Sequence, residues 1–364
     1  MNETLPARIH EMFPRYVELL KVLIRIPSIS FDHFDQAEVH RSAQAVKTLF
    51  ESYGFTNARF LTPRSGRASV FAELKTHPDN PTVLLYAHHD VQPTMREALW
   101  ESAPFAPEVR NGRLYGRGAA DDKSGIILHI AAVSQALAVC GDRMPNVKFL
   151  IEGEEECGSS GFGELLENNK ALLQADAVII ADLSNFSAGT PSITTSLRGM
   201  SAVSVIVKSV KAPLHSGSWS GPIPDPVQAL CKMVASLTDA EGNILVEHFN
   251  DGIAEPTAEE LESYKALHYT EETFRKESGM LPGTKVLGGK DSILETLWRK
   301  PSLVVTAFEA GSRNQAGNVL QDSAYARIGI RLAPGMQTER ATRLLEEHLK
   351  RNCPDGLTLT LIPE

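Results

Sequence analysis

The chain has 364 residues, of which 42% are hydrophobic and 22% are charged, a composition typical of a globular protein and not of a disordered or fibrous one. Its formal net charge of −9, without any block of Lys and Arg, argues against a nucleic-acid-binding surface, because phosphates need clustered positive charge. This length is sufficient for two domains and at least one large core.

The N-terminus and the cysteines indicate the cellular setting. Residues 1–20 include early acidic residues and no long apolar segment, so we expect a first helix and not a secretion signal. We also expect no membrane span, because no apolar run approaches the length that a span requires. Four cysteines lie far apart without a CxxC pair, which favours reduced thiols in a cytoplasmic protein: Cys140, Cys157, Cys231 and Cys353.

Up to about residue 187, apolar strand-like runs alternate with helical patterns, which is typical of an α/β domain. Helices are expected at 41–54 and 122–141, and each ends at a glycine that can stop a helix. We therefore predict an α/β domain over residues 1–187, with a parallel or mixed sheet flanked by helices. Its clearest strands are 69–74, 82–88, 147–153 and 177–182.

From about Ile193, polar and apolar residues alternate as in strands of a half-solvated antiparallel sheet. The order of strands and helices predicts a compact α+β domain of the ferredoxin-like type over residues 188–364. Residues 245–300, rich in Glu and Lys, form a helical insertion within it. The expected strands are 201–210, 323–334 and 357–364, and the expected helices are 225–237 and 338–352.

Residues that bind metals follow each strong strand of the first half, and ligands of open α/β sheets bind at these carboxyl ends. Imidazole and carboxylate donors without thiolate suit Zn, Mn or Co, and so many carboxylates indicate two ions. The residues are His88, His89 and Asp90, then Asp121 and Asp122, then Glu152, Glu154, Glu155 and Glu156, and finally Asp182.

Five motifs in order, "AHHDVQP", "YGRGAADDKSG", "EGEEECGS", "IIAD" and "LHSGSWSG", resemble those of the two-zinc exopeptidases and amidohydrolases that include carnosinase, aminoacylase and glutamate carboxypeptidase. The carnosinase-type dipeptidase branch is the most similar, because "LWRKPSL" and "GIRLAP" also resemble it. The resemblance covers nearly the whole chain. It implies a zinc-exopeptidase-like catalytic domain and a second domain that serves as lid and dimerisation domain.

The resemblance also implies roles for the residues of the first domain. Asp121 would bridge two ions, Asp90 would orient His88, and Glu155 would act as general base on the attacking water. His89 is expected to point away, and Asp122 to cap the following helix. Glu152 and Glu154 are expected to support the ligands or to face solvent. Cys157 is expected to serve as a small neutral residue and not as a nucleophile. The implied metal ligands are His88, Asp121, Glu156 and Asp182.

In the second domain, the resemblance implies that His215 reaches the active site of a partner subunit and stabilises the oxyanion. Arg331 would bind the substrate carboxylate, with Asn318 near the same group. A homodimer through the second domain follows. Related proteins continue to a late histidine that ligates the second ion, so we expect that site to be incomplete here, with one ion bound tightly and the other weakly.

Together, these residues predict a metal-dependent exopeptidase or dipeptidase that hydrolyses an amide bond by metal-bound hydroxide, with Glu155 as general base. An N-acyl-amino-acid deacylase is an alternative, because the same residues act on either amide. A second alternative is a catalytically impaired remnant that only binds metal or dimerises. The expected ligand is a small peptide or an N-acyl amino acid, and neither nucleic acid nor membrane.

Overall fold

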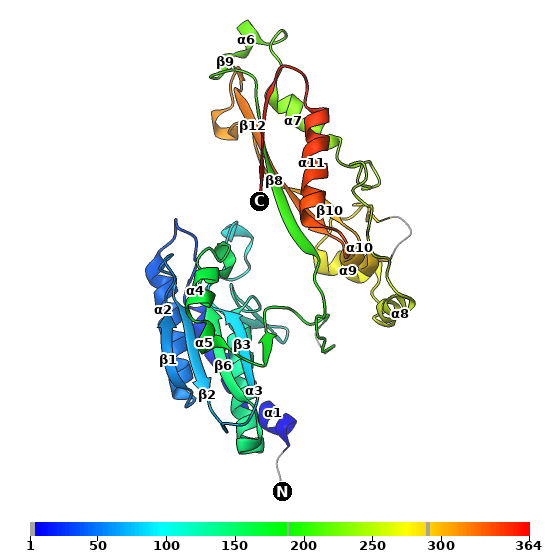
Figure 1. The fold of residues 1–364 in the computed structure, drawn as a ribbon. Coiled ribbons are helices and arrows are strands. Elements are labelled where there is room, and N and C mark those ends of the chain that lie inside the picture. The colour runs from blue at the N-terminus through cyan, green and yellow to red at the C-terminus, as the bar shows by residue number, and fades with distance from the viewer. Residues whose placement is uncertain (1–3, 188, 289–291) are drawn as a thin grey trace. The chain divides into compact units, whose positions relative to one another are not determined.

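The computed structural model describes residues 4–187, 189–288 and 292–364, which form two compact units (Figure 1). The first unit extends to Ile193 and the second begins at Thr194. The boundary expected at residue 187 thus lies within the first unit. Each unit is described by itself.

A mixed five-stranded sheet forms the centre of the first unit. Its strands are antiparallel from β1 through β2 to β6, and parallel from β6 through β3 to β7. The predicted α/β class with a parallel or mixed sheet is therefore confirmed, and the antiparallel half is its mixed part. The strand order is β1 (Thr56–Leu61), β2 (Ser69–Leu74), β6 (Asn146–Glu152), β3 (Thr82–His88) and β7 (Ala177–Ile180).

Helices cover this sheet because its central strands bury side chains on both faces. On β6, Phe149 and Ile151 belong to the core that residues of α1, α2 and α3 share, whereas Leu150 belongs to a smaller cluster with residues of α4 and α5. The helices are α1 (Leu5–Ile24), α2 (Gln36–Ser52), α3 (Lys123–Cys140), α4 (Phe162–Asn168) and α5 (Lys170–Leu173), and a hairpin joins β4 (Glu108–Arg110) to β5 (Arg113–Tyr115).

Helix α3 is unusually apolar, and its start positions part of the site. Asp122 caps it by accepting a hydrogen bond from the Gly125 N–H. In the described part of the chain, only the segment Lys123–Arg143 has the length and composition to cross a membrane. The expectation that no apolar run reaches this length is therefore wrong. This segment contains α3, which packs on α1 and β3 and buries Ile126 and Ile130 in the core.

The second unit contains a four-stranded antiparallel sheet, in the order β10 (Ser302–Glu309), β12 (Ser323–Leu332), β8 (Gly199–Lys208) and β13 (Thr358–Pro363). Helices α7 (Pro226–Ala235) and α11 (Thr338–Asn352) pack on it through one apolar core. Along the chain these elements follow the order strand, helix, two strands, helix and strand. With the sheet order just given, they form the predicted ferredoxin-like α+β unit.

Smaller elements complete the second unit. The pair β9 (Leu214–His215) and β11 (Val319–Leu320) lies beside α6 (Ser216–Trp219) at one end of the unit (Figure 1). The predicted helical insertion contains α8 (Ala258–Ala266), α9 (Glu271–Ser278) and α10 (Ile293–Arg299). Part of that segment, 289–291, lies outside the described residues.

Candidate metal centre

The predicted site of the first unit is assembled at the carboxyl ends of two parallel strands. His88 is the last residue of β3 and pairs in register with Glu152, the last residue of β6. Loops from these ends, together with the start of α3, bring the other acidic residues to the same edge of the sheet. His88 is completely buried, so its ring has a fixed environment.

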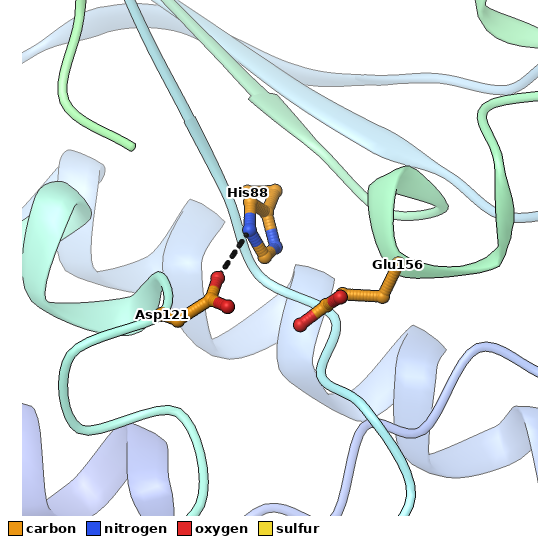
Figure 2. Close-up of side chains that lie close together, drawn as sticks. All are labelled: His88, Asp121 and Glu156. Atoms are coloured by element: carbon orange, nitrogen blue, oxygen red, sulfur yellow. Dashed lines mark hydrogen bonds and ion pairs between the residues drawn. The ribbon is translucent and has the colours of Figure 1, made fainter. Parts of the chain in front are cut away.

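Three carboxylates surround one nitrogen of the His88 ring. Its Nε2 lies 3.0 Å from Asp121 Oδ1, 3.5 Å from Asp182 Oδ1 and 3.8 Å from Glu155 Oε2. Figure 2 shows His88 between Asp121 and Glu156, with the dashed line marking the hydrogen bond to Asp121. So many negative groups around one imidazole suit a bound cation.

Two sets of side chains could hold metal ions, and both use His88. The first set is His88, Asp121 and Glu156, and the second is His88, Asp122 and Asp182; within each set the donor atoms lie within 4.8 Å of one another. An imidazole with carboxylates and no thiolate is a donor set that fits divalent zinc, manganese or cobalt. The structure therefore brings together all four side chains that the resemblance implied as ligands.

Asp122 was expected as a helix cap, and the structure confirms that role. One of its oxygens accepts from the Gly125 N–H at 3.2 Å, and the other accepts from the His88 N–H at 3.1 Å. Asp122 thus links the start of α3 to the end of β3 through hydrogen bonds. Burial raises the pKa of Asp122 to about 8.

Asp90 lies on the other side of the His88 ring and is also completely buried. One Asp90 carboxylate oxygen lies 3.3 Å from His88 Nδ1, and the carboxylate accepts hydrogen bonds from the backbone N–H groups of Glu155 at 3.3 Å and Glu156 at 3.0 Å. The Asp90 backbone carbonyl, 3.1 Å from Nδ1, and this carboxylate together fix the ring and leave Nε2 free for a cation. The same carboxylate also fixes the segment that carries both glutamates.

Glu155 and Glu156 lie on a short 3₁₀ helix, Glu155–Cys157, directly after β6, but their surroundings differ. The Glu156 carboxylate accepts from the Gln92 backbone N–H at 3.2 Å and from the Gln92 side chain at 2.7 Å. The Glu155 side chain makes the longer contact to His88 and is 38% exposed. Glu156 is held in place, whereas Glu155 is accessible to water.

Burial and neighbouring charges shift the pKa values of the residues in the site. Burial lowers the pKa of His88, but hydrogen bonds to Asp121, Asp182 and Asp90 outweigh it and raise the pKa far above its ordinary value. Burial raises the pKa of Glu155, and nearby carboxylates add to this effect while His88 opposes it. Without a metal ion, a proton on His88 supplies the positive charge that these carboxylates favour.

Glu152 and Glu154 are both buried, each with 1% of its surface exposed, so the expectation that they could face solvent is wrong. Glu152 accepts from the Tyr86 hydroxyl at 2.7 Å, and Glu154 accepts from the Gly161 N–H at 2.6 Å. Burial raises the pKa of Glu152 to about 7. Both act as internal supports of the loop after β6.

Two neighbouring residues lie away from the site chemistry. His89 points to the carbonyl of Ala68, with Nε2 at 2.9 Å from the oxygen, as its alternation along the strand predicted. Burial raises the pKa of the Cys157 thiol, and the thiol donates to the Glu154 carbonyl, which leaves it a poor nucleophile. All four cysteines are free.

The sequence reading missed two supporting residues. Gln92, which holds Glu156, follows Asp90 in the first motif and could have been suspected from that position. Lys123 is completely buried, and its ammonium donates to the backbone carbonyls of Leu23 at 2.8 Å and Ile26 at 2.6 Å. In the sequence, only its position directly after two aspartates indicated a possible role for Lys123.

The predicted residues of the second unit fall at two separate places. His215 on β9 and Asn318 lie together, because Val319 pairs with His215 and the Ser216 N–H donates to the Asn318 carbonyl at 2.9 Å. Arg331 is exposed near the other end of β12, where it pairs in register with Met200. Within this unit, Arg331 is therefore not brought together with His215 and Asn318.

Comparison with known sequences identifies relatives of the chain. The chain is 33% identical over 280 residues to the cysteinylglycine-S-conjugate dipeptidase of Corynebacterium striatum, covering 76% of this chain and 59% of that protein. It is 35% identical over 301 residues to the human Beta-Ala-His dipeptidase, covering 80% of this chain and 59% of that protein. The chain thus spans about three fifths of the length of these two relatives.

Comparison with solved structures supports the same relationship. The dipeptidase Dug1p of Saccharomyces cerevisiae matches with a TM-score of 0.86 and 26% identity, covering 100% of this chain and 80% of that one. Human carnosine dipeptidase 1 matches with a TM-score of 0.82 and 31% identity, covering 99% and 80%. The sequence profile described as Peptidase family M20/M25/M40 matches residues 84–326, about two thirds of the chain. The chain belongs to this peptidase family.

Proposed function

We propose that this chain carries the metal-binding catalytic part and the lid part of a dipeptidase that hydrolyses the peptide bond of a small peptide. The observation that carries the proposal is the convergence of Asp121, Asp182 and Glu155 on Nε2 of His88, with Asp90 on the opposite nitrogen. The relatives with the highest similarity quoted above are dipeptidases, which favours a dipeptide over an N-acyl amino acid as substrate.

His88, Asp121, Glu156 and Asp182 would hold two divalent ions, with Asp121 between them. When bound, such ions lower the pKa of water and polarise the carbonyl group of the substrate. Zinc, manganese and cobalt all fit this donor set. Asp90 keeps the His88 ring in the orientation that presents Nε2 to an ion.

Glu155 would be the general base. Its carboxylate is partly exposed, and burial together with flanking carboxylates raises its pKa toward the working range of a base at neutral pH. Such a group can take a proton from the attacking water and pass it to the leaving amine. Glu156, held by Gln92 on both oxygens, is less free to exchange a proton.

His215 would act across a homodimer formed through the second unit. Ser323 lies near the β9–β11 pair, and Arg331 lies eight positions further along β12. Strand geometry therefore places the two residues about 27 Å apart. His215 and Arg331 of one chain are thus too far apart to contact one small substrate, which supports His215 of one copy acting with Arg331 of the other. Exposed Val304 and Phe308 on the edge strand β10 offer apolar surface for such a contact.

The resemblance implied that Asn318 lies near the substrate carboxylate with Arg331; because Asn318 lies beside His215 in this unit, it would instead contribute next to the oxyanion. The four free cysteines support a reducing, cytoplasmic location.

Glu155→Gln tests the proposal, because it keeps the shape of the side chain but removes the basic carboxylate. Hydrolysis of a dipeptide panel in the presence of Zn, Mn or Co should fall by about 10²- to 10⁴-fold, while metal binding remains. The matched control is Glu167→Gln on the exposed face of α4, which should retain full activity. Turnover by Glu155→Gln equal to that of the control would refute the assignment, and no turnover with any metal would refute the activity.

A further inference from the structure

A pocket of about 720 Å³ lies between the segment that follows Gln92 and the segment that leads to Asp121. Its walls come from residues 94–101 and from the hairpin region 110–117. The residues that matter here are Arg96, Arg110, Arg117, Trp100, Tyr115 and Glu101. Three arginines in one pocket are unexpected on a chain with a net charge of −9.

Arg117 is the most firmly placed of these arginines. Its guanidinium lies 5.3 Å from the centre of the Trp100 ring, and its Nη2 donates to the Pro93 carbonyl at 3.2 Å. The Trp100 ring is itself held by a hydrogen bond from Nε1 to the Thr94 carbonyl at 3.1 Å. An arginine fixed in this way loses little freedom when it binds a ligand.

The Nε–H of Arg117 has no hydrogen-bond partner among the described residues, although the atom is buried. A buried donor without an acceptor is unfavourable in the folded chain. Arg117 also lies within electrostatic reach of the metal centre: His88 chiefly, and Arg117 in addition, lower the pKa of Asp121. The charge of Arg117 therefore acts on a residue of the proposed metal centre.

The charges of the other two arginines differ. Arg110 is balanced, because its guanidinium lies 2.8 Å from the Glu108 carboxylate and 3.5 Å from the Glu101 carboxylate. The Arg96 side chain is exposed and forms no ion pair in the part of the chain that the structure describes. Among the described residues, the pocket thus presents two guanidinium groups without an ion pair, those of Arg117 and Arg96.

We propose that this pocket binds a carboxylate of the substrate, with Arg117 as the anchor and Arg96 as a second donor. A planar carboxylate matches the fork of a guanidinium and can accept from its N–H groups. The pocket then favours dipeptides with an acidic residue over their amide counterparts. This preference in hydrolysis rests on the proposed dipeptidase function, whereas binding of a carboxylate does not.

Isothermal titration calorimetry with succinate and its uncharged counterpart succinamide tests binding directly on the whole chain. Succinate should bind at least about tenfold more tightly than succinamide, and Arg117→Gln and Arg96→Gln should each remove about tenfold of that affinity. Arg113→Gln, an exposed arginine of β5 outside the pocket, is the matched control and should bind as the unmodified chain does. Succinate binding that survives in both pocket variants, or that equals succinamide binding, would overturn the proposal.

Hydrolysis of Ala-Asp and Ala-Asn separates this proposal from the proposed function. A higher kcat/KM for Ala-Asp that is lost in Arg96→Gln supports both. Succinate binding that depends on the two arginines, without hydrolysis of either dipeptide, keeps the pocket and rejects the peptidase. Equal hydrolysis of both dipeptides, with succinate binding unaffected in the variants, rejects the pocket and keeps the peptidase.

Discussion

Replacing Asp90 with asparagine is the sharpest test of how this site is held together. The Asp90 carboxylate accepts two backbone N–H groups, from Glu155 and Glu156, and also lies against Nδ1 of His88. Asparagine has nearly the same shape but only one acceptor oxygen, and its amide group would face a donor. At least one buried N–H group would therefore lose its acceptor.

The magnitude follows from these contacts. An unsatisfied buried donor costs about 1–3 kcal/mol of folding stability. Because about 1 kcal/mol shifts the melting temperature of a domain of this size by about 2–4 °C, Asp90→Asn should lower Tm by about 2 °C or more. Loss of the carboxylate that orients a ligating histidine costs about 10- to 100-fold in metal affinity.

Zinc affinity, measured by competition with a chromogenic chelator, and Tm, measured by calorimetry, should both change. The matched control is Asp79→Asn, whose carboxylate is 92% exposed and lies 3.7 Å from the Nδ1 atom of His77. This surface pair resembles the buried pair in its atoms but not in its burial, so both measurements should stay constant. Zinc affinity of Asp90→Asn within about twofold of the unmodified chain would refute the role given to Asp90.

Three further predictions concern buried charge and the metal. Burial raises the pKa of Glu152 to about 7. The folded chain therefore keeps a proton on Glu152 that the unfolded chain releases above about pH 4.3. The contribution of this group to the free energy of unfolding should fall from about pH 4.5 to pH 7 and then level off. Glu152→Gln should show a smaller decrease between pH 5 and pH 8 than the unmodified chain, because Asp122, with its pKa raised to about 8, contributes a decrease of its own in both proteins. Urea midpoints of chelator-treated protein measure the difference, and an equal decrease in both proteins would contradict the role given to Glu152. Lys123→Met leaves the Leu23 and Ile26 carbonyls without their donor and should cost about 1–3 kcal/mol in urea unfolding, whereas Lys170→Met at an exposed position should not; equal midpoints would rule this out. Zinc at about 100 times its Kd should stabilise the chelator-treated chain by about 2.7 kcal/mol, and an unchanged Tm would count against a metal centre.

The sequence predicted the strands that lead into the site almost to the residue. β2 and β3 have the predicted bounds, because "SVFAEL" and "TVLLYAH" are apolar runs with polar or turn-forming residues beyond them. β1 was not predicted, because half of the residues of "TNARFL" are polar and half are exposed, so its strand conformation depends on pairing with β2. Tertiary contact, and not local preference, decides such an edge strand.

The candidate residues His88, Glu155, Glu156 and Asp182 could be picked out for the same reason, since each lies at or just after a strand whose end was clear, whereas Asp121 lies in the segment that leads into α3. The burial of Glu152 and Glu154 could not be predicted from the sequence. A buried glutamate needs a donor from elsewhere in the fold, and here Tyr86 on the neighbouring strand and the Gly161 N–H supply it. The pocket arginines likewise have no local pattern, because Arg96 and Arg117 are brought together only by the fold.

The register of β3 against β6 limits how such a protein can change during evolution. His88 and Glu152 are paired in adjacent parallel strands, and successive side chains of a strand point to opposite faces. Insertion of a single residue within either strand would turn one of them away from the site, whereas length changes in the loops outside the strands leave the pairing unchanged. Mutational tolerance along the first unit should therefore be lowest for insertions in these two short strands, even at positions where many substitutions are accepted.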